Sequence, residues 1–157
     1  MSDVRAFVLD VDGVLTDDTF WWGPNGEEWK RFSFADVMGI SRARRAGYIF
    51  ALVSGEESPL VHRFAEKLGI QDVFTNCKAK VTALSEFAER HRLKLSEIAF
   101  MGNDVNDIEA MALAGVAAAP ADAQRIAKSA ASLVTRSTSG KGAVREMIET
   151  IFPELIR

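Results

Sequence analysis

Short uninterrupted apolar runs alternate with amphipathic segments along most of this chain. Four such runs lie at residues 6–9, 48–53, 98–101 and 116–119. Continuous runs of this length, without polar alternation, are typical of strands that are buried on both faces of a parallel sheet. The segments between them carry apolar residues at helical spacing. This order predicts an α/β fold with a doubly wound parallel sheet.

The amphipathic segment that follows the second run has the clearest boundaries. Ser58 followed by Pro59 predicts a capped helix start, and Gly69 predicts its end in a left-handed conformation. Gly47 predicts the end of the preceding helix in the same way. Three further helices are predicted from apolar residues at helical spacing, which are Val37, Ile40 and Ala43, then Val81, Leu84, Phe87 and Ala88, then Ile108, Met111 and Ala112.

Residues 19–32 break this alternation. Residues 19–22 and 27–32 resemble two strands around Gly23-Pro24-Asn25-Gly26, in which Asn-Gly is a strong hairpin signal. The segment contains all three tryptophans of the chain. Two strands cannot cover so much aromatic surface, so the hairpin packs either on its own domain or on another subunit. We favour another subunit, because a lone ribbon leaves its edges bare.

Composition narrows the class of protein. The 157 residues are 48% apolar and 26% charged, which fits one domain over 1–157 with a β-hairpin insert at about 17–33. The net charge of −3 disfavours nucleic-acid binding. A single cysteine excludes a disulfide framework and suits a reducing, cytoplasmic setting. Neither a signal peptide nor a membrane span is expected.

Polar residues follow the first and second apolar runs. Asp10 and Asp12 come at the end of the first run, and Gly13 permits a sharp turn there. Two carboxylates this close repel each other unless a cation or a proton lies between them. Ser54 and Gly55 follow the second run and form a possible anion nest for phosphate. Each pattern by itself is also typical of an ordinary turn.

The next two polar elements complete the series. Lys80 opens the third predicted helix, and Asn103, Asp104 and Asp107 follow the third apolar run. Carboxylate and amide oxygens at a strand end suit a hard cation such as Mg²⁺. Lysines are usually solvated and Asp or Asn often caps a helix, so neither element is specific. The order of the four elements along the chain is specific, because each follows a strand and ligands of open α/β sheets bind at the carboxyl ends of the strands.

These four elements resemble the four motifs of the haloacid dehalogenase superfamily of phosphotransferases. The first motif is similar to residues 10–17, the second to Ser54, the third to Lys80 and the fourth to residues 102–107. The chain also resembles one branch of this superfamily in three features. It leaves no room for a cap domain, it has the aromatic hairpin, and it contains the segment 140–146. That branch contains 3-deoxy-D-manno-octulosonate 8-phosphate phosphatases, nonulosonate 9-phosphate phosphatases and phosphatase domains linked to acylneuraminate cytidylyltransferases.

The resemblance implies a role for each motif residue. Asp10 would be the nucleophile that forms an aspartyl-phosphate, and Asp12 the general acid and base. Ser54, Gly55 and Lys80 would hold the phosphoryl oxygens. Mg²⁺ would be bound by Asp10, the carbonyl of Asp12, Asn103 and Asp104. Members of the branch are typically homotetramers whose hairpins form a central barrel, so a neighbouring subunit would close the site.

One residue departs from the family pattern. Asn103 stands where the family most often has an aspartate as metal ligand, which removes one compensating charge. Asp104 is the alternative direct ligand. The departure keeps a second interpretation open, in which the chain is a catalytically degenerate oligomerisation module beside an acylneuraminate cytidylyltransferase.

We therefore predict a Mg²⁺-dependent phosphatase, a phosphoric monoester hydrolase. Its substrate would be a phosphorylated sugar acid of lipopolysaccharide or sialic acid biosynthesis, and the sequence leaves the individual sugar open. A carboxylate on the substrate would need cations, for which Arg63, Lys67, Lys141 and Arg145 are candidates. Glu56 is a candidate for binding sugar hydroxyls.

Overall fold

The main sheet has six parallel strands. The computed structural model describes residues 3–156. The strand order is β5-β4-β1-β6-β7-β8. The strands are β1 (Ala6–Asp10), β4 (Ile49–Val53), β5 (Asp72–Phe74), β6 (Ile98–Met101), β7 (Val116–Ala119) and β8 (Leu133–Val134). The predicted doubly wound α/β fold is confirmed.

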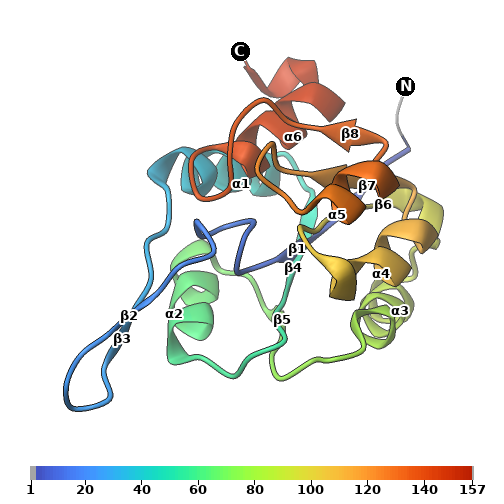
Figure 1. The fold of residues 1–157 in the computed structure, drawn as a ribbon. Helices are drawn as coiled ribbons and strands as arrows, with labels where there is room; N and C mark the ends of the chain where they lie inside the picture. The colour runs from blue at the N-terminus through green and yellow to red at the C-terminus, as the bar shows by residue number, and fades with distance from the viewer. Residues whose placement is uncertain (1–2, 157) are drawn as a thin grey trace.

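Helices cover both faces of this sheet (Figure 1). One face carries α1 (Phe34–Arg45), α2 (Pro59–Leu68) and α6 (Ala143–Ile151). The other carries α3 (Lys80–His91), α4 (Ile108–Leu113) and α5 (Arg125–Ala130). Short 3₁₀ helices are η1 (Leu95–Glu97), η2 (Val105–Asp107) and η3 (Pro153–Ile156). None of the helices in residues 3–156 has the length and apolar character to cross a bilayer.

Strand β1 shows why the apolar runs are continuous. Phe7 and Leu9 are fully buried in the core beneath α1, α2 and α6. Ala6 and Val8 are fully buried in the core beneath α3, α4 and α5. Because side chains alternate between the two faces of a strand, a sheet covered on both sides requires apolar residues at successive positions.

Helix boundaries follow the predicted signals. The side chain of Ser58 accepts a hydrogen bond from the backbone N–H of Leu60, and Gly69 ends α2 with φ of 65°. Helix α1 ends at Arg45 with Ala46 as its C-cap, and Gly47 follows with φ of 99°. Both predicted stops are confirmed.

The strand order creates a switch point between β1 and β6. From β1 the chain proceeds to β4 and β5 on one side, and then returns to β6, β7 and β8 on the other. The connections that leave β1 and β6 therefore separate in opposite directions. A crevice forms at the carboxyl ends of such strands. Asp10 ends β1, and Asn103 lies two residues after β6.

The hairpin extends away from the rest of the molecule (Figure 1). It contains β2 (Trp21–Trp22) and β3 (Glu28–Trp29), which pair in antiparallel fashion. Its strands are shorter than the predicted 19–22 and 27–32, because the chain leaves the ladder after Trp29. There the ring of Phe32 stacks on Phe64 of α2, with centroids 4.3 Å apart.

Candidate active site

Asp10 is the buried acidic end of β1. It is only 5% exposed, and its Oδ1 accepts hydrogen bonds from the backbone N–H of Val11 at 2.8 Å and from Lys80 Nζ at 2.7 Å. Burial, followed by the Asp107 carboxylate, raises the pKa of Asp10 to about 7, although Lys80 acts in the opposite direction. The side chain therefore lies where a further positive charge favours its ionised form.

Lys80 joins two acidic groups from different parts of the chain. It begins α3 and is almost fully buried, and its Nζ also donates to Asp107 Oδ1 at 2.6 Å. Burial acts to lower the pKa of Lys80, but attraction by Asp10 and Asp107 outweighs burial and raises it. The lysine is thus a fixed cation beside Asp10.

Asp107 also organises the loop after β6. Its Oδ2 accepts the backbone N–H groups of Asn103 at 2.8 Å and Asp104 at 3.2 Å. Gly102 permits this packing, because a Cβ at residue 102 would clash with the Asp107 side chain. The loop is therefore held in the conformation that directs Asn103 towards β1.

The amide of Asn103 faces two oxygen atoms of the β1 loop. One amide position lies 2.7 Å from Asp10 Oδ2 and 3.1 Å from the Asp12 carbonyl oxygen. If the amide nitrogen occupies that position, it donates to both oxygens. If the amide oxygen does, three oxygens face one another without a proton between them. Gly13, with φ of 82°, permits the approach, because a Cβ there would clash with the amide.

This set of oxygens fits a hard cation. A carboxylate, a backbone carbonyl and an amide carbonyl are ligand types that Mg²⁺ takes in proteins, where water completes its coordination. The fit depends on backbone and amide oxygens. In the described part of the chain, no group of three or more His, Cys, Asp or Glu side chains has the geometry to hold a metal ion. We therefore identify Asp10, Asp12 and Asn103 as the residues able to hold Mg²⁺.

Asp12 is held by two different contacts. Its Oδ1 accepts from Thr16 Oγ1 at 3.2 Å, and its Oδ2 accepts from Lys30 Nζ at 2.9 Å. The Asp12 side chain is 31% exposed, whereas that of Lys30 is 5% exposed. The carboxylate of Asp12 is thus accessible from the crevice while its orientation is fixed.

Ser54 and Gly55 follow β4, the neighbour of β1. Val53 is the register partner of Asp10, so Ser54 begins at the same edge of the sheet. Ser54 is buried, and its Oγ accepts from the backbone N–H of Glu56 at 3.2 Å. The Gly55 carbonyl accepts from Lys78 Nζ at 2.6 Å. The structure therefore brings the predicted phosphate-binding loop beside Asp10.

The side chains of Asp104 and Glu56 make their contacts away from Asp10. A carboxylate oxygen of Asp104 accepts from the backbone N–H of Val105 at 2.6 Å and so caps η2. Glu56 is largely exposed and forms an ion pair of 3.6 Å with Lys78. Asn103, rather than Asp104, has the side chain that faces Asp10.

Lys67 and Arg63 line a cavity of about 550 Å³ between α2 and the segment that follows the hairpin. Lys30 lines the same cavity, together with Phe32, Phe34 and Phe64. The Nζ of Lys67 lies 5.7 Å from the ring centroid of Phe34. Arg145 instead bonds Glu149 within α6 at 2.7 Å. Glu66 also lines the cavity, whose lining is otherwise mainly cationic and aromatic. Lys30, which bonds Asp12, is the lining residue that connects the cavity to the β1 loop.

Sequence reasoning missed Lys30. The lysine is 18 residues from Asp12 and lies on a hairpin arm whose aromatic residues predict an interface. No local pattern signals such a contact. Phe32 and Phe64 hold that arm on α2 by stacking on each other. Their apolar character predicts burial but does not identify the partner of either ring.

Comparisons with known proteins agree with this geometry. Residues 71–148 match the family model for haloacid dehalogenase-like hydrolases. The chain is 34% identical over 150 residues to 3-deoxy-D-manno-octulosonate 8-phosphate phosphatase of Escherichia coli (strain K12), covering 96% of this chain and 80% of the relative. A phosphatase of the same name from Moraxella catarrhalis, solved with magnesium ion, phosphate ion and KDO, has a TM-score of 0.94 at 31% identity. That alignment covers 97% of this chain and 87% of the other.

A second solved relative gives the same result. The cobalt-bound deoxy-D-mannose-octulosonate 8-phosphate phosphatase of Haemophilus influenzae has a TM-score of 0.93 at 34% identity. The match covers 98% of this chain and 87% of the other.

Proposed function

The chain belongs to the haloacid dehalogenase-like hydrolases and is a phosphoric monoester hydrolase, and on this basis we propose that it hydrolyses a sugar-acid phosphate with Mg²⁺ and an aspartyl-phosphate intermediate. The observation that carries the proposal is the convergence of Asp10, Asn103 and the Asp12 carbonyl, with Lys80 fixed beside Asp10.

Asp10 is the proposed nucleophile. Its carboxylate oxygen forms a bond to phosphorus as the bond between phosphorus and the sugar oxygen breaks. Asp12 gives a proton to the departing sugar oxygen and then removes a proton from water. That water attacks phosphorus, the bond to Asp10 breaks, and inorganic phosphate is released. Two easier displacements replace one difficult displacement.

Three groups in this proposal bind the phosphoryl oxygens. Ser54, the backbone N–H of Gly55 and Lys80 supply donors at the edge of the sheet where Asp10 lies. Negative charge spreads over these oxygens in the transition state, so donors fixed in advance stabilise it. The contact of Lys80 with Asp107 keeps the lysine in place without substrate.

Mg²⁺ is the proposed cofactor. The Asp10 carboxylate, the Asp12 carbonyl and the Asn103 amide oxygen would hold it, and Asp104 would act through water. When bound, the ion offsets the repulsion between the Asp10 carboxylate and a phosphate dianion. The magnesium and phosphate ions bound to the Moraxella catarrhalis relative support this proposal.

The cavity beside Asp12 is the proposed site for the sugar acid. Lys67 and Arg63 would supply positive charge for a substrate carboxylate. Glu56, which is exposed and paired with Lys78 outside the lining of this cavity, would bind hydroxyl groups. The substrates would be of the 3-deoxy-octulosonate 8-phosphate or nonulosonate 9-phosphate type. The names of the two relatives from Escherichia coli and Moraxella catarrhalis support the first type.

Assembly as a homotetramer is part of the proposal. Residues 1–157 would form one cytoplasmic domain with the hairpin as an insert. Trp21, Trp22 and Trp29 are 55%, 72% and 51% exposed. Exposed aromatic side chains in this number are typical of protein interfaces. A neighbouring copy would cover them and help to exclude water from the site.

A phosphatase assay tests the function directly. The purified chain is assayed with 3-deoxy-D-manno-octulosonate 8-phosphate, a nonulosonate 9-phosphate and glucose 6-phosphate, with Mg²⁺ and with a chelator. We expect Mg²⁺-dependent turnover that favours a sugar-acid phosphate. Equal turnover with the chelator would contradict the metal requirement. Absence of turnover on every substrate would favour the oligomerisation module instead.

A further inference from the structure

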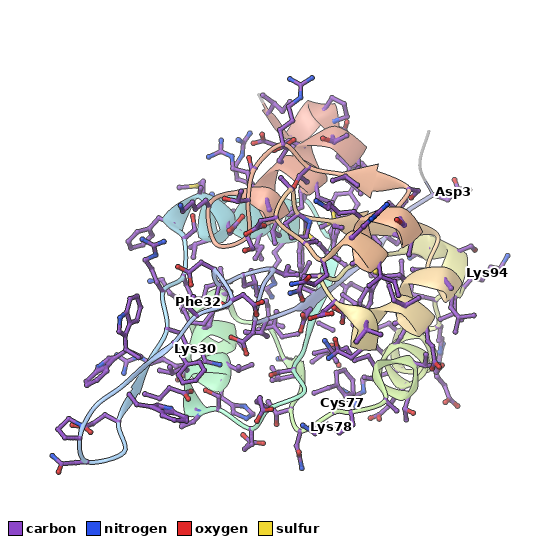
Figure 2. The ribbon with its side chains drawn as sticks, in the orientation of Figure 1. Asp3, Lys30, Phe32, Cys77, Lys78 and Lys94 are labelled. Carbon is purple, nitrogen blue, oxygen red and sulfur yellow. The ribbon has the colours of Figure 1, made fainter. Side chains whose placement is uncertain are left out.

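Lys30 is a buried cation that the proposed chemistry does not use. It comes directly after β3, and its side chain is 5% exposed. A lysine is seldom buried to this extent unless its charge is paired. Its Nζ lies 2.9 Å from Asp12 Oδ2 and 3.9 Å from Glu28 Oε2. Figure 2 shows Lys30 and Phe32 on the arm between the hairpin and α1, beside α2.

A continuous series of contacts connects the hairpin to Asp12. Trp22 and Glu28 face each other in the β2–β3 ladder, and Trp22 Nε1 donates to Glu28 Oε1 at 3.1 Å. The other carboxylate oxygen of Glu28 lies near Lys30 Nζ, which bonds Asp12. The position of the Lys30 ammonium group therefore depends on the conformation of the hairpin.

Asp12 has few other groups that fix its orientation. Apart from Thr16 on Oδ1, Lys30 is the group that the structure places within hydrogen-bond distance of its carboxylate. Thr16 and Asp12 belong to the same loop, so Lys30 supplies the contact from a distant part of the chain. A general acid must meet the departing oxygen at hydrogen-bond distance, and small displacements reduce its efficiency.

We propose that Lys30 is a positioning residue for Asp12, through which the hairpin conformation affects protonation of the leaving group. The inference rests on the proposed role of Asp12 as general acid. Lys30 donates one hydrogen bond to Oδ2, and the second lone pair of that oxygen holds the proton that Asp12 gives to the leaving group. The hairpin is then a part of the active site as well as a surface for assembly.

An alternative role for Lys30 is to bind the substrate. The lysine also lines the cavity that contains Arg63 and Lys67, so it is near the proposed position of a substrate carboxylate. A binding lysine affects kcat/KM only for substrates that carry a sugar carboxylate, whereas a positioning lysine affects kcat/KM for every substrate whose leaving group needs a proton, phenyl phosphate included. The two roles are thus separable by kinetics.

Leaving-group dependence tests the proposal. The variant Lys30→Met removes the charged end but keeps most of the length and the apolar stem of the side chain. Its kcat and KM are measured with p-nitrophenyl phosphate, phenyl phosphate and 3-deoxy-D-manno-octulosonate 8-phosphate. The first substrate releases a stable anion, and the other two release groups that need a proton.

We expect Lys30→Met to lower kcat/KM, which reports phosphoryl transfer to Asp10, for phenyl phosphate and the sugar phosphate by roughly tenfold to a hundredfold. For p-nitrophenyl phosphate we expect kcat/KM to change by less than about threefold. The comparison uses kcat/KM because Asp12 also activates the water that hydrolyses the aspartyl-phosphate, and that step contributes to kcat for all three substrates. Lys30→Arg restores part of the lost turnover, because it again supplies a buried cation.

Arg31→Met is the matched control. Arg31 is the next residue on the same arm and forms an ion pair of 3.2 Å with Asp17, at an exposed position. We expect this variant to leave all three activities unchanged. If Lys30→Met does not fold, Lys30→Gln keeps a polar end at that position and is assayed instead, with the same selective loss expected.

Several results would overturn the inference. Equal losses of kcat/KM on all three substrates indicate a structural role, and a loss of kcat/KM confined to the sugar-acid phosphate indicates binding. Asp12→Asn separates this inference from the proposed function. If Asp12→Asn lowers kcat/KM selectively for phenyl phosphate and Lys30→Met does not, only the role of Lys30 is wrong. If Asp12→Asn shows no selectivity, the acid role of Asp12 is itself wrong.

Discussion

Three buried charged residues meet at the end of β1. Asp10, Asp107 and Lys80 lie within hydrogen-bond distance, and their formal charges sum to −1 when both acids are ionised. Buried charges are costly unless they are paired, so Asp10 is the group that responds, with its pKa raised to about 7 by burial and then by Asp107. A divalent cation on the other oxygen of Asp10 would stabilise its ionised form.

Asn103 is the residue whose substitution tests the metal site most directly. Asn103→Asp restores a negative ligand, so we expect the Mg²⁺ concentration for half-maximal activity to fall. The gain is modest because Asp10 already supplies negative charge nearby. Asn103→Ala removes the oxygen, and we expect a higher metal requirement and slower turnover. The measurement is a Mg²⁺ titration of phosphatase activity.

Asp104→Ala is the comparison for these variants. The Asp104 side chain caps η2 and does not face Asp10. We expect a smaller change in the metal requirement than for Asn103→Ala. If Asp104→Ala abolishes activity while Asn103→Ala leaves the metal requirement unchanged, Asp104 is the direct ligand.

The sequence predicted the group around Asp10 because the carboxyl ends of parallel strands meet at one edge of the sheet. Asp10, Ser54 and Asn103 each follow an apolar run, so their proximity follows from the fold class. Lys30 could not be predicted in this way. Its contact with Asp12 depends on how the chain leaves β3, which is determined by packing of Phe32 on Phe64.

At the scale of elements, the hairpin has aromatic residues that its own two strands cannot cover. We expect the triple variant Trp21→Ser, Trp22→Ser and Trp29→Ser to form smaller assemblies than the wild type, because it loses the exposed apolar surface. Light scattering coupled to size exclusion measures the mass. Activity per chain is expected to fall with it.

Leu113→Ser and Ile126→Ser serve as the control for this prediction. Both residues are exposed apolar side chains, 46% and 49% exposed, on α4 and α5 rather than on the hairpin. We expect their mass to equal that of the wild type. A wild-type protein that is monomeric at the concentrations of the assay would contradict the proposed assembly.

Asp36 connects two helices that are far apart in sequence. It is buried in the first turn of α1 and accepts backbone N–H groups of Gly142 at 3.3 Å and Arg145 at 3.1 Å, at the start of α6. We expect Asp36→Ala to lower the free energy of unfolding by about 1–3 kcal/mol, because buried donors lose their acceptor. Urea denaturation measures the difference.

The same variant gives a pH dependence with a definite sign. Burial raises the pKa of Asp36 in the folded protein, although the N–H groups of Arg145 and Gly142 act against it. The folded state therefore binds a proton more tightly than the unfolded state, and this contribution is lost as pH rises through the folded pKa. We expect the cost of Asp36→Ala to be larger at pH 4 than at pH 8, and the opposite order would contradict this.

Helices were predicted more accurately than the hairpin for a physical reason. The start and end of α2 depend on Ser58, Pro59 and Gly69, whose effects are local. The ends of β2 and β3 depend instead on tertiary contacts that draw Lys30 and Phe32 out of the ladder. Strand propensity alone therefore predicted strands that were too long.

At the scale of the whole molecule, the proposed metal site spans the switch point of the sheet. Asp10 and Asp12 follow β1, Asn103 follows β6, and these two strands pair along the centre of the sheet. Both cores contain side chains from β1 and β6. A ligand that joins the loops after these strands is thus coupled to unfolding of the entire domain.

Metal binding is therefore expected to raise the melting temperature. A ligand at a hundred times its Kd stabilises the folded state by about 2.7 kcal/mol. For a chain of this size that corresponds to roughly 5–10 °C. Differential scanning fluorimetry with MgCl₂, against NaCl at matched ionic strength, measures the shift independently of activity.

Asp10→Asn separates metal binding from general salt effects. The amide still accepts from Val11 and Lys80, so the fold is expected to remain, but the charged metal ligand and the nucleophile are lost. We expect no detectable turnover and a Mg²⁺ shift much smaller than that of the wild type, because a neutral oxygen binds a divalent cation less strongly than a carboxylate. An equal shift in both proteins would place the bound Mg²⁺ elsewhere on the molecule. A wild-type protein without any shift at saturating Mg²⁺ would contradict a metal site between β1 and β6.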